Sequence, residues 1–237
     1  MLRPYILSWP LVGRASFSAM DNRCGWSTAN AQMIAYHDTE WGVPVHNDTQ
    51  LFGKLVLDGF QAGLSWAIIL RKRDAFLKAF DGFTPDKMAR YDARRIAKIL
   101  RDPGIVRNKQ KVKSAVGNAR AFLQLKDAGE SFDQFLWQFV GGKPKVNAWK
   151  TLRGVPAETR ESTAMSKALV ERGFRFVGPT IVYAFMQAVG MVNDHLVACY
   201  RYRELTREVG ARPWRAPTSR APDTGRTADR RGPSRRG

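Results

Sequence analysis

Apolar residues recur along most of the chain at the spacing of amphipathic helices. Beginning near Asp48, apolar side chains lie three or four residues apart, as one face of a helix requires. The residues that carry this pattern are Leu51, Phe52, Leu55, Val56 and Phe60. Similar patterns predict helices over about 30–39, 66–80, 85–101, 108–127, 131–140, 162–172 and 179–202. No segment alternates convincingly with a period of two, so the sequence predicts an all-α fold.

Capping and turn residues mark several of these helix ends. Thr84 before Pro85 is typical of an N-cap followed by proline at the first helical position. The run Asp102-Pro103-Gly104 is a stop signal, and a later helix is expected to begin at Ser162 and to end at Gly173.

The composition divides the chain into three sections. Residues 1–21 form a weakly patterned leader, and residues 22–205 carry the helical pattern of a folded domain. Residues 206–237 are rich in Arg, Pro, Gly, Ser and Thr and have few large apolar residues, so this tail is expected to be disordered. We expect the domain to function without the leader.

The net charge of +18 indicates a polyanionic partner, of which nucleic acid is the usual one. Residues 212–237 hold eight Arg, two Asp and no Lys, so +12 remains on residues 1–211. A basic tail on an unrelated soluble protein is the alternative. Two cysteines are too few for the disulfide framework of a secreted protein, and no run of 18 apolar residues could cross a membrane. The leader is a poor signal peptide, because Pro4, Pro10 and Arg14 interrupt its apolar run. We therefore expect a cytoplasmic protein without a membrane partner.

Both cysteines and two of the three histidines form pairs near the two ends of the predicted domain. Cys24 and His37 lie near its start, whereas His195 and Cys199 are four residues apart in a predicted helix and would share one face. Two thiolates and two imidazoles suit one tetrahedral zinc ion, and four protein ligands would make it structural. The spacing is equally compatible with inert cysteines and unrelated histidines. His46 is expected to be exposed and not a ligand.

Residues 101–120 combine a helix stop with a basic helix. A turn at Pro103-Gly104 and a short apolar segment precede the helix, which is the outline of a helix-hairpin-helix. In such a unit, backbone N–H groups near Gly104 and flanking basic side chains bind DNA phosphates without reading sequence. The flanking basic side chains are Arg107, Lys109, Lys111 and Lys113. An ordinary solvated basic helix would have the same pattern.

Asp58 lies on the apolar stripe of the helix that begins near Asp48. A carboxylate in such a position is costly unless it has a partner or a task. Aromatic residues are frequent nearby in sequence, and an aromatic box beside a carboxylate is suited to bind a cation. These aromatic residues are Trp26, Tyr36, Trp41, Phe60 and Trp66. An aromatic core with a helix-capping aspartate is the alternative.

Several long motifs resemble the 3-methyladenine DNA glycosylase I family and occur in order over about residues 22–203. They are CGW at 24–26, AYHDTEWGVP at 35–44, QAGLSW at 61–66, KAL at 167–169, GFRFVG at 173–178, FMQA at 185–188 and VNDH at 192–195. The resemblance implies a helix-hairpin-helix glycosylase fold with a structural zinc clip of Cys24, His37, His195 and Cys199. It also implies excision of 3-methyladenine from double-stranded alkylated DNA by base flipping.

The resemblance further implies roles for individual residues. Asp58 would accept hydrogen bonds from the adenine edge, and Tyr36 and Trp66 would stack on or hydrogen-bond the base. Trp26 and Trp41 would form an aromatic wall with Met33 and Phe60 nearby, and Gly63 and Leu64 would enter the gap left by the flipped base. The chain departs from the family at two positions, where Asp58 replaces a glutamate and Met33 a residue that is often tyrosine.

Three other functions remain compatible with these residues. The scaffold could bind alkylated DNA without cleaving it, because Asp58 is shorter than glutamate, or it could excise another alkylated purine. The chain could also be a zinc-stabilised nucleic-acid protein without a pocket. We expect a monomer with no obligate protein partner.

Overall fold

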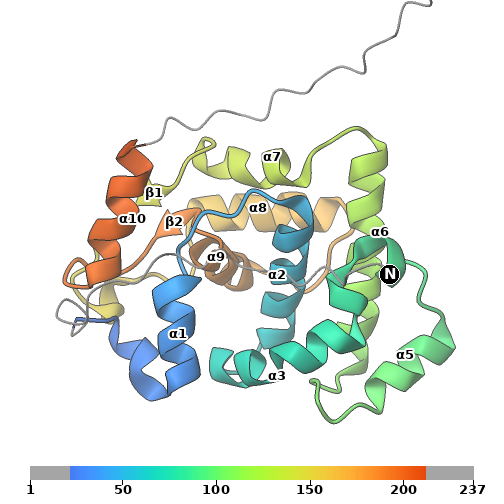
Figure 1. Ribbon diagram of the computed structural model, residues 1–237. Coiled ribbons are helices and arrows are strands. Elements are labelled where there is room, and N and C mark those ends of the chain that lie inside the picture. Colours follow the sequence, from blue (N-terminus) through green and yellow to red (C-terminus); the bar gives the residue numbers. More distant parts are fainter. Residues whose placement is uncertain (1–21, 212–237) are drawn as a thin grey trace, which may run out of the picture.

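The computed structural model describes residues 22–211, which fold mostly into helices (Figure 1). The predicted leader and residues 212–237 of the predicted tail lie outside the described residues. The helices are α1 (Ala31–Thr39), α2 (Asp48–Gln61), α3 (Trp66–Ala79), α4 (Pro85–Met88), α5 (Ala93–Leu100), α6 (Lys109–Asp127), α7 (Phe132–Trp137), α8 (Arg160–Glu171), α9 (Pro179–Ala188) and α10 (Tyr200–Ala211). Two short strands, β1 (Lys145–Val146) and β2 (Val192–Asn193), pair in parallel. The mostly helical class predicted from the sequence is confirmed.

Side-chain caps explain where several helices begin. Asn47 and Asn108 precede α2 and α6, and the side chain of each accepts hydrogen bonds from backbone N–H groups in the first turn. Thr159 and Ser162 form a reciprocal capping box at the start of α8. This helix therefore begins before Ser162 rather than at it.

Helix α2 lies at the centre of the molecule and packs against α3, α6, α7 and α9 (Figure 1). Every residue from Leu51 to Phe60 is buried. The ring of Phe60 packs against those of Phe76 and Phe80, with centroids 4.7 and 5.6 Å away. The two charged side chains in this buried stretch, Lys54 and Asp58, consequently need partners inside the protein.

The two ends of the described chain meet on one side of the molecule, where α1 and α10 both lie (Figure 1). The backbone N–H of Tyr200 donates a hydrogen bond of 3.1 Å to the carbonyl of Asn22. A second, smaller core cluster joins these segments to α3 and α9. Its buried members are Cys24, Met33, Tyr36, Trp41, Leu70, Ala188 and Cys199.

The predicted helix over 179–202 is wrong, because α9 ends at Ala188 and α10 begins only at Tyr200. Gly190 has a φ of +71°, and a Cβ at this position would lie 2.5 Å from the backbone nitrogen of Pro44. Only glycine permits so tight a turn against that segment. His195 and Cys199 therefore lie between β2 and α10 and do not share a helix face.

Two other boundaries differ from the prediction. The expected helix over 85–101 is divided into α4 and α5, because Asp92 caps a new helix by accepting from the backbone N–H of Arg95. Helix α10 continues to Ala211, beyond the predicted domain end at residue 205. None of the described helices is long and apolar enough to cross a membrane.

Candidate functional site

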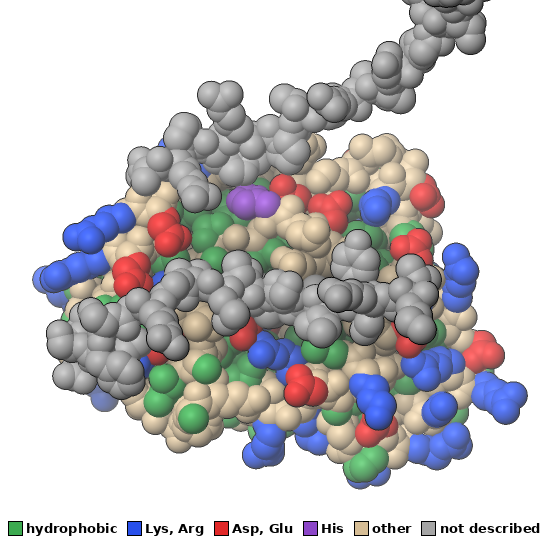
Figure 2. All heavy atoms as spheres, viewed as in Figure 1, with side chains coloured by type: hydrophobic (Ala, Val, Ile, Leu, Met, Phe, Trp, Pro, Cys, Tyr) green, Lys and Arg blue, Asp and Glu red, His purple; other side chains and the backbone are tan. Residues whose placement is uncertain are grey.

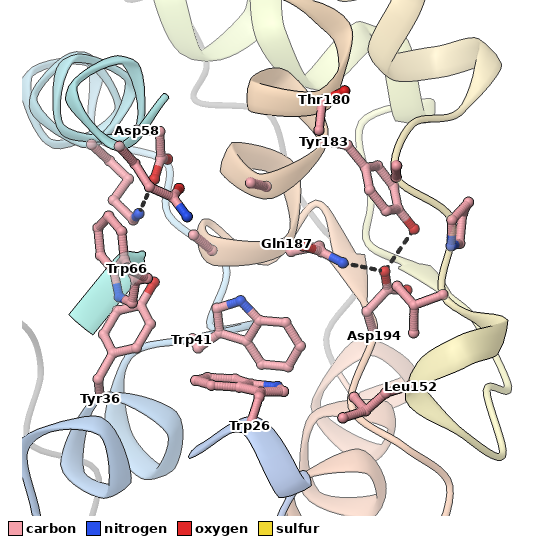
Figure 3. A pocket seen from close by; sticks show the side chains of 17 residues that line it. Trp26, Tyr36, Trp41, Asp58, Trp66, Leu152, Thr180, Tyr183, Gln187 and Asp194 are labelled. Atoms are coloured by element: carbon pink, nitrogen blue, oxygen red, sulfur yellow. Dashed lines mark hydrogen bonds and ion pairs between the residues drawn. The ribbon is translucent and has the colours of Figure 1, made fainter. Parts of the chain in front are cut away.

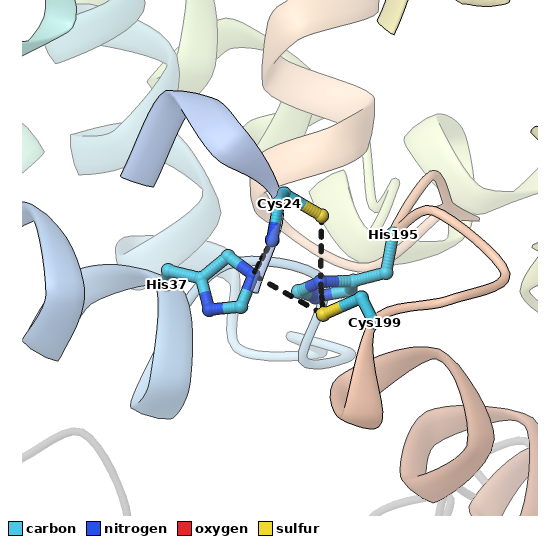
Figure 4. A group of neighbouring side chains, drawn as sticks. All are labelled: Cys24, His37, His195 and Cys199. Carbon is cyan, nitrogen blue, oxygen red and sulfur yellow. Dashed lines mark hydrogen bonds between the residues drawn. The ribbon is translucent and has the colours of Figure 1, made fainter. Parts of the chain in front are cut away.

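Four buried side chains that could bind a metal ion converge where the two ends of the described chain meet (Figure 4). The ligand atoms of Cys24, His37, His195 and Cys199 all lie within 4.8 Å of one another. Nδ1 of His195 is 3.7 Å from the Cys24 sulfur and 3.6 Å from the Cys199 sulfur. Nε2 of His37 is 3.5 Å from the Cys199 sulfur. One ion could therefore contact all four side chains, although His195 and Cys199 reach it from a loop.

In each histidine, the ring nitrogen that faces away from the cysteine sulfurs, here called the outer nitrogen, also has a partner. Nδ1 of His37 lies 2.8 Å from Asp38, which in turn forms an ion pair of 2.9 Å with Arg23. Nε2 of His195 lies 3.1 Å from the carbonyl oxygen of Trp41. An N–H on each outer nitrogen leaves the inner nitrogen with the lone pair that a metal needs. Burial lowers the pKa of His195 and so favours the neutral, metal-binding ring.

A cavity of about 410 Å³ lies next to this cluster, between α1, α2, α3 and α9 (Figure 3). Trp41 connects the two features, because it lines the cavity and its ring centroid lies 4.5 Å from that of His195. The cavity is lined by Trp26, Tyr36, Trp41, Lys54, Asp58, Gln61, Trp66, Leu152, Val155, Pro156, Ala157, Thr180, Tyr183, Ala184, Gln187, Ala188 and Asp194.

Four of the predicted aromatic residues form two pairs in the cavity wall. Trp26 and Trp41 meet edge to face with centroids 4.9 Å apart. Tyr36 and Trp66 have centroids 5.3 Å apart, next to the end of α2 that carries Asp58 (Figure 3). The cavity thus offers flat apolar surfaces beside a carboxylate.

Two predicted pocket residues do not line this cavity. Phe60 is two residues beyond Asp58, so it points to another side of α2 and packs in the main core against Phe76 and Phe80. Met33 is buried in the small core cluster beneath the cavity wall. Neither is therefore retained as a base-contacting residue.

Asp58 is buried, and its two carboxylate oxygens differ in their surroundings. Oδ1 lies 2.7 Å from the ammonium of Lys54, one helical turn earlier. Oδ2 has no hydrogen-bond partner in the described part of the chain. Burial raises the pKa of Asp58 and lowers that of Lys54, while the pairing opposes both shifts.

The opposite wall of the cavity is polar and was not predicted. Asp194 accepts hydrogen bonds from Tyr183 at 2.6 Å and from Gln187 at 2.8 Å (Figure 3). It also accepts from Asn147 and Trp149, at 2.7 and 2.8 Å. Burial and the hydrogen bond to Asp194 raise the pKa of Tyr183, which keeps this hydroxyl protonated. The sequence offered one signal for this wall: Tyr183 and Gln187 are four residues apart, so their side chains lie on the same face of α9.

The segment predicted to bind DNA begins with a tight turn between α5 and α6. The backbone N–H of Gly104 donates to Oδ1 of Asp102 at 2.7 Å, and a Cβ at Gly104 would lie 2.7 Å from that of Ala75. Arg107 and Lys109 are exposed just after this turn. Figure 2 shows Lys and Arg side chains gathered along the lower right of the view, over the region of α3 and α5.

Lys111, which was also predicted to bind DNA, points into the protein. Its ammonium donates to the carbonyl oxygens of Phe60 at 2.9 Å and Ala62 at 2.5 Å. Burial lowers its pKa. Lys111 thus supports the loop that carries Gly63, with a φ of +76°, and the exposed Leu64, instead of facing solvent.

The comparisons with known proteins agree with one another. A family model described as methyladenine glycosylase matches residues 26–202. DNA-3-methyladenine glycosylase 1 of Escherichia coli (strain K12) is 47% identical over 180 residues, which are 76% of this chain and 96% of the relative.

Solved structures show the same similarity. A crystal structure of 3-methyladenine DNA glycosylase I superposes with a TM-score of 0.75 at 43% identity, covering 76% of this chain and 98% of the other. A variant of 3-methyladenine DNA glycosylase I in complex with 3-methyladenine gives a TM-score of 0.73 at 35% identity. The match covers 76% of this chain and 96% of that one.

Proposed function

Since the chain belongs to the methyladenine glycosylase family, we propose that it removes 3-methyladenine from alkylated double-stranded DNA. The enzyme hydrolyses the N-glycosidic bond of the flipped nucleotide and leaves an abasic site. The observation that carries the proposal is the aromatic cavity with Asp58 in its wall, in a chain similar to a protein solved with 3-methyladenine.

The chemistry of the substrate requires little proton transfer. Adenine methylated at N3 is cationic while it is attached to the sugar, and it leaves as a neutral base. The pocket must therefore hold the base and admit water. Tyr36 and Trp66 hold its ring, Trp26 and Trp41 close one side, and Oδ2 of Asp58 accepts from the exocyclic amine.

The DNA backbone binds along the turn before α6. The exposed side chains of Arg107 and Lys109 contact phosphates, as in a helix-hairpin-helix, while the N–H of Gly104 is bound to Asp102 and shapes the turn. Leu64 fills the gap left by the flipped base, and Gly63 gives the loop the backbone conformation it needs. Lys111 acts indirectly, by holding this loop to α6.

Cys24, His37, His195 and Cys199 would together hold one structural zinc ion. In a tetrahedral site with Zn–S near ~2.3 Å and Zn–N near ~2.0 Å, sulfur and nitrogen atoms lie about 3.5 Å apart. The observed separations of 3.5 to 3.7 Å support this fit. With four protein ligands such an ion would have no position left for water, so its role would be structural, to join the two ends of the domain.

The test is chromatography of the bases that the purified protein releases from methylated DNA. We expect 3-methyladenine in excess of an enzyme-free control. Release of a different methylated purine instead would identify another lesion as the substrate. Binding of methylated DNA without any base release would favour the binding-module alternative.

A further inference from the structure

Helix α5 carries a row of basic side chains to which the proposed reaction assigns no task. Arg94, Lys98 and Arg101 are spaced by four and three residues, so they lie on one face of the helix, and all three are exposed. We call these three residues the α5 stripe. The other face of α5 is apolar, because Ile99 is buried in the main core and Leu100 packs against it. Packing against α6 therefore holds α5 with the stripe toward solvent.

Within the described residues, nothing neutralises the α5 stripe. None of its members forms an ion pair or a side-chain hydrogen bond there. Arg95, on the same helix, differs from them, because its guanidinium donates to the carbonyl of Ala79 at 2.9 Å and forms an ion pair of 3.2 Å with Asp81. Helix α5 thus turns one of its cations toward the protein and leaves the stripe in water.

The acidic residues near the stripe are fewer than the basic ones. Residues 92–107 hold five basic and two acidic side chains, which gives a net charge of +3. The two acids, Asp92 and Asp102, lie at the ends of α5 and accept hydrogen bonds from backbone N–H groups. Cations in the first turn oppose the helix dipole, and like charges four residues apart repel each other. This arrangement is unfavourable in the free protein and becomes favourable when an anionic surface covers it.

The α5 stripe continues the surface that the proposed function assigns to DNA. Its last residue directly precedes the turn at residues 102–104, and Arg107 and Lys109 are exposed beyond that turn. The ammonium of Lys72 on α3 donates to the carbonyl of Pro103 at 2.8 Å, so the turn is also held to α3. Lys and Arg side chains gather in this region, at the lower right of Figure 2.

We propose that the α5 stripe is a second phosphate-binding surface, which extends the contact of the protein along one flank of the duplex. The inference rests on the proposed function, because it takes duplex DNA as the partner. At about 1.5 Å per residue, Arg94 and Arg101 lie roughly 10 Å apart along the helix axis. A duplex of that length carries about six phosphate charges, which is enough to face three cations. Such contacts carry no sequence information and suit a search along undamaged DNA.

The experiment measures the salt dependence of binding to an undamaged duplex by fluorescence anisotropy. The stripe variant, Arg94→Gln with Lys98→Gln, removes two of the three charges. One control is Arg95→Gln, which removes a charge from the same helix, but one that points toward the protein. The other control is Arg203→Gln with Arg207→Gln, which removes two exposed charges with the same four-residue spacing from α10, on the opposite side of the molecule (Figure 1).

The stripe variant should bind the duplex more weakly at low salt. Its slope of log K against log salt should be flatter than that of the parent by about 1.8, as expected for two lost phosphate contacts. Adding Arg101→Gln should flatten the slope by about a further 0.9. Both controls should keep the parent slope. Circular dichroism establishes that each variant is folded, and the α10 control decides alone if Arg95→Gln does not fold.

A parent slope in the folded stripe variant would overturn the inference, and the proposed function would stand if the parent protein still releases base from methylated DNA. Equal flattening in the α10 control would overturn it as well, because a general loss of charge would then explain the result. Flattening confined to the stripe variant, in a protein that releases no base, would support the DNA-binding surface and contradict the proposed function.

Discussion

At the scale of single residues, the two carboxylate oxygens of Asp58 differ. Oδ1 forms an ion pair with Lys54, and Oδ2 has no partner in the described residues and can accept a hydrogen bond from a base. Asp58→Asn removes the charge from that acceptor and should slow 3-methyladenine release by about 10- to 100-fold. This factor corresponds to the roughly 1.5–3 kcal/mol of a hydrogen bond to a charged group. Single-turnover release from methylated DNA measures the effect.

The matched variant is Asp58→Glu, which keeps the charge and adds one methylene. It should retain the parent rate or exceed it, because the family's usual side chain is the longer one. If Asp58→Asn releases base as fast as the parent and is equally well folded, Asp58 has only a structural role.

The sequence predicted part of the cavity lining. Motif resemblance and the carboxylate on an apolar stripe identified Asp58, Tyr36 and Trp66, which the structure places around the cavity. Lys54 was not predicted, because a lysine one turn from an aspartate has the sequence pattern of an ordinary surface ion pair. It lines the cavity because the stretch of α2 from Leu51 to Phe60 is buried. Phe60 was misassigned because nearness in sequence does not imply the same helix face.

At the scale of elements, Lys111 links α6 to the loop after α2, whereas Lys109 on the first turn of α6 faces solvent. Lys109→Ala should weaken DNA binding and reduce the slope of log K against log salt by about 0.9, as expected for one lost phosphate contact. Lys111→Met should leave this slope unchanged. It should lower base release instead, because Leu64 loses its support.

Fluorescence anisotropy with a labelled duplex over a range of salt concentrations gives the slopes. Equal slopes for the parent and Lys109→Ala would contradict the phosphate contact. A reduced slope in Lys111→Met would show that this lysine turns outward to bind DNA.

The starts of helices were predictable from the sequence where a capping residue precedes the helix. Asn47 and Asn108 cap α2 and α6 where the apolar pattern begins, and these helices begin within a residue or so of the expected positions. The end of α9 was not predictable from its own sequence, since the apolar pattern continues past Ala188. The chain turns there because Gly190 packs directly against the backbone at Pro44, a contact across the fold.

At the scale of the whole molecule, the buried cluster of Cys24, His37, His195 and Cys199 connects segments that are far apart in sequence. Cys199→Ala should abolish stoichiometric zinc and lower the melting temperature by about 10 °C, because zinc binding contributes to the free energy of folding. Zinc analysis of the purified, unchelated protein and calorimetry measure the two effects. Absence of zinc from the parent protein would contradict the proposed ion.

The basic C-terminal segment allows a second prediction at this scale. Deleting residues 212–237 removes eight Arg and two Asp, while the described helices stay intact. The truncated protein should bind undamaged DNA more weakly at low salt and with a flatter salt dependence, because fewer counterions are released. Base release at saturating DNA should not change. Unaltered affinity at low salt would show that the segment does not contact DNA.

The most direct test of the central claim counts the products of a single turnover on methylated duplex DNA. The parent protein should release 3-methyladenine and leave one abasic site for each base released. The strand should stay intact until alkali cleaves it, since hydrolysis of the glycosidic bond is the only reaction proposed. DNA that is bound but yields neither free base nor abasic sites would contradict the account.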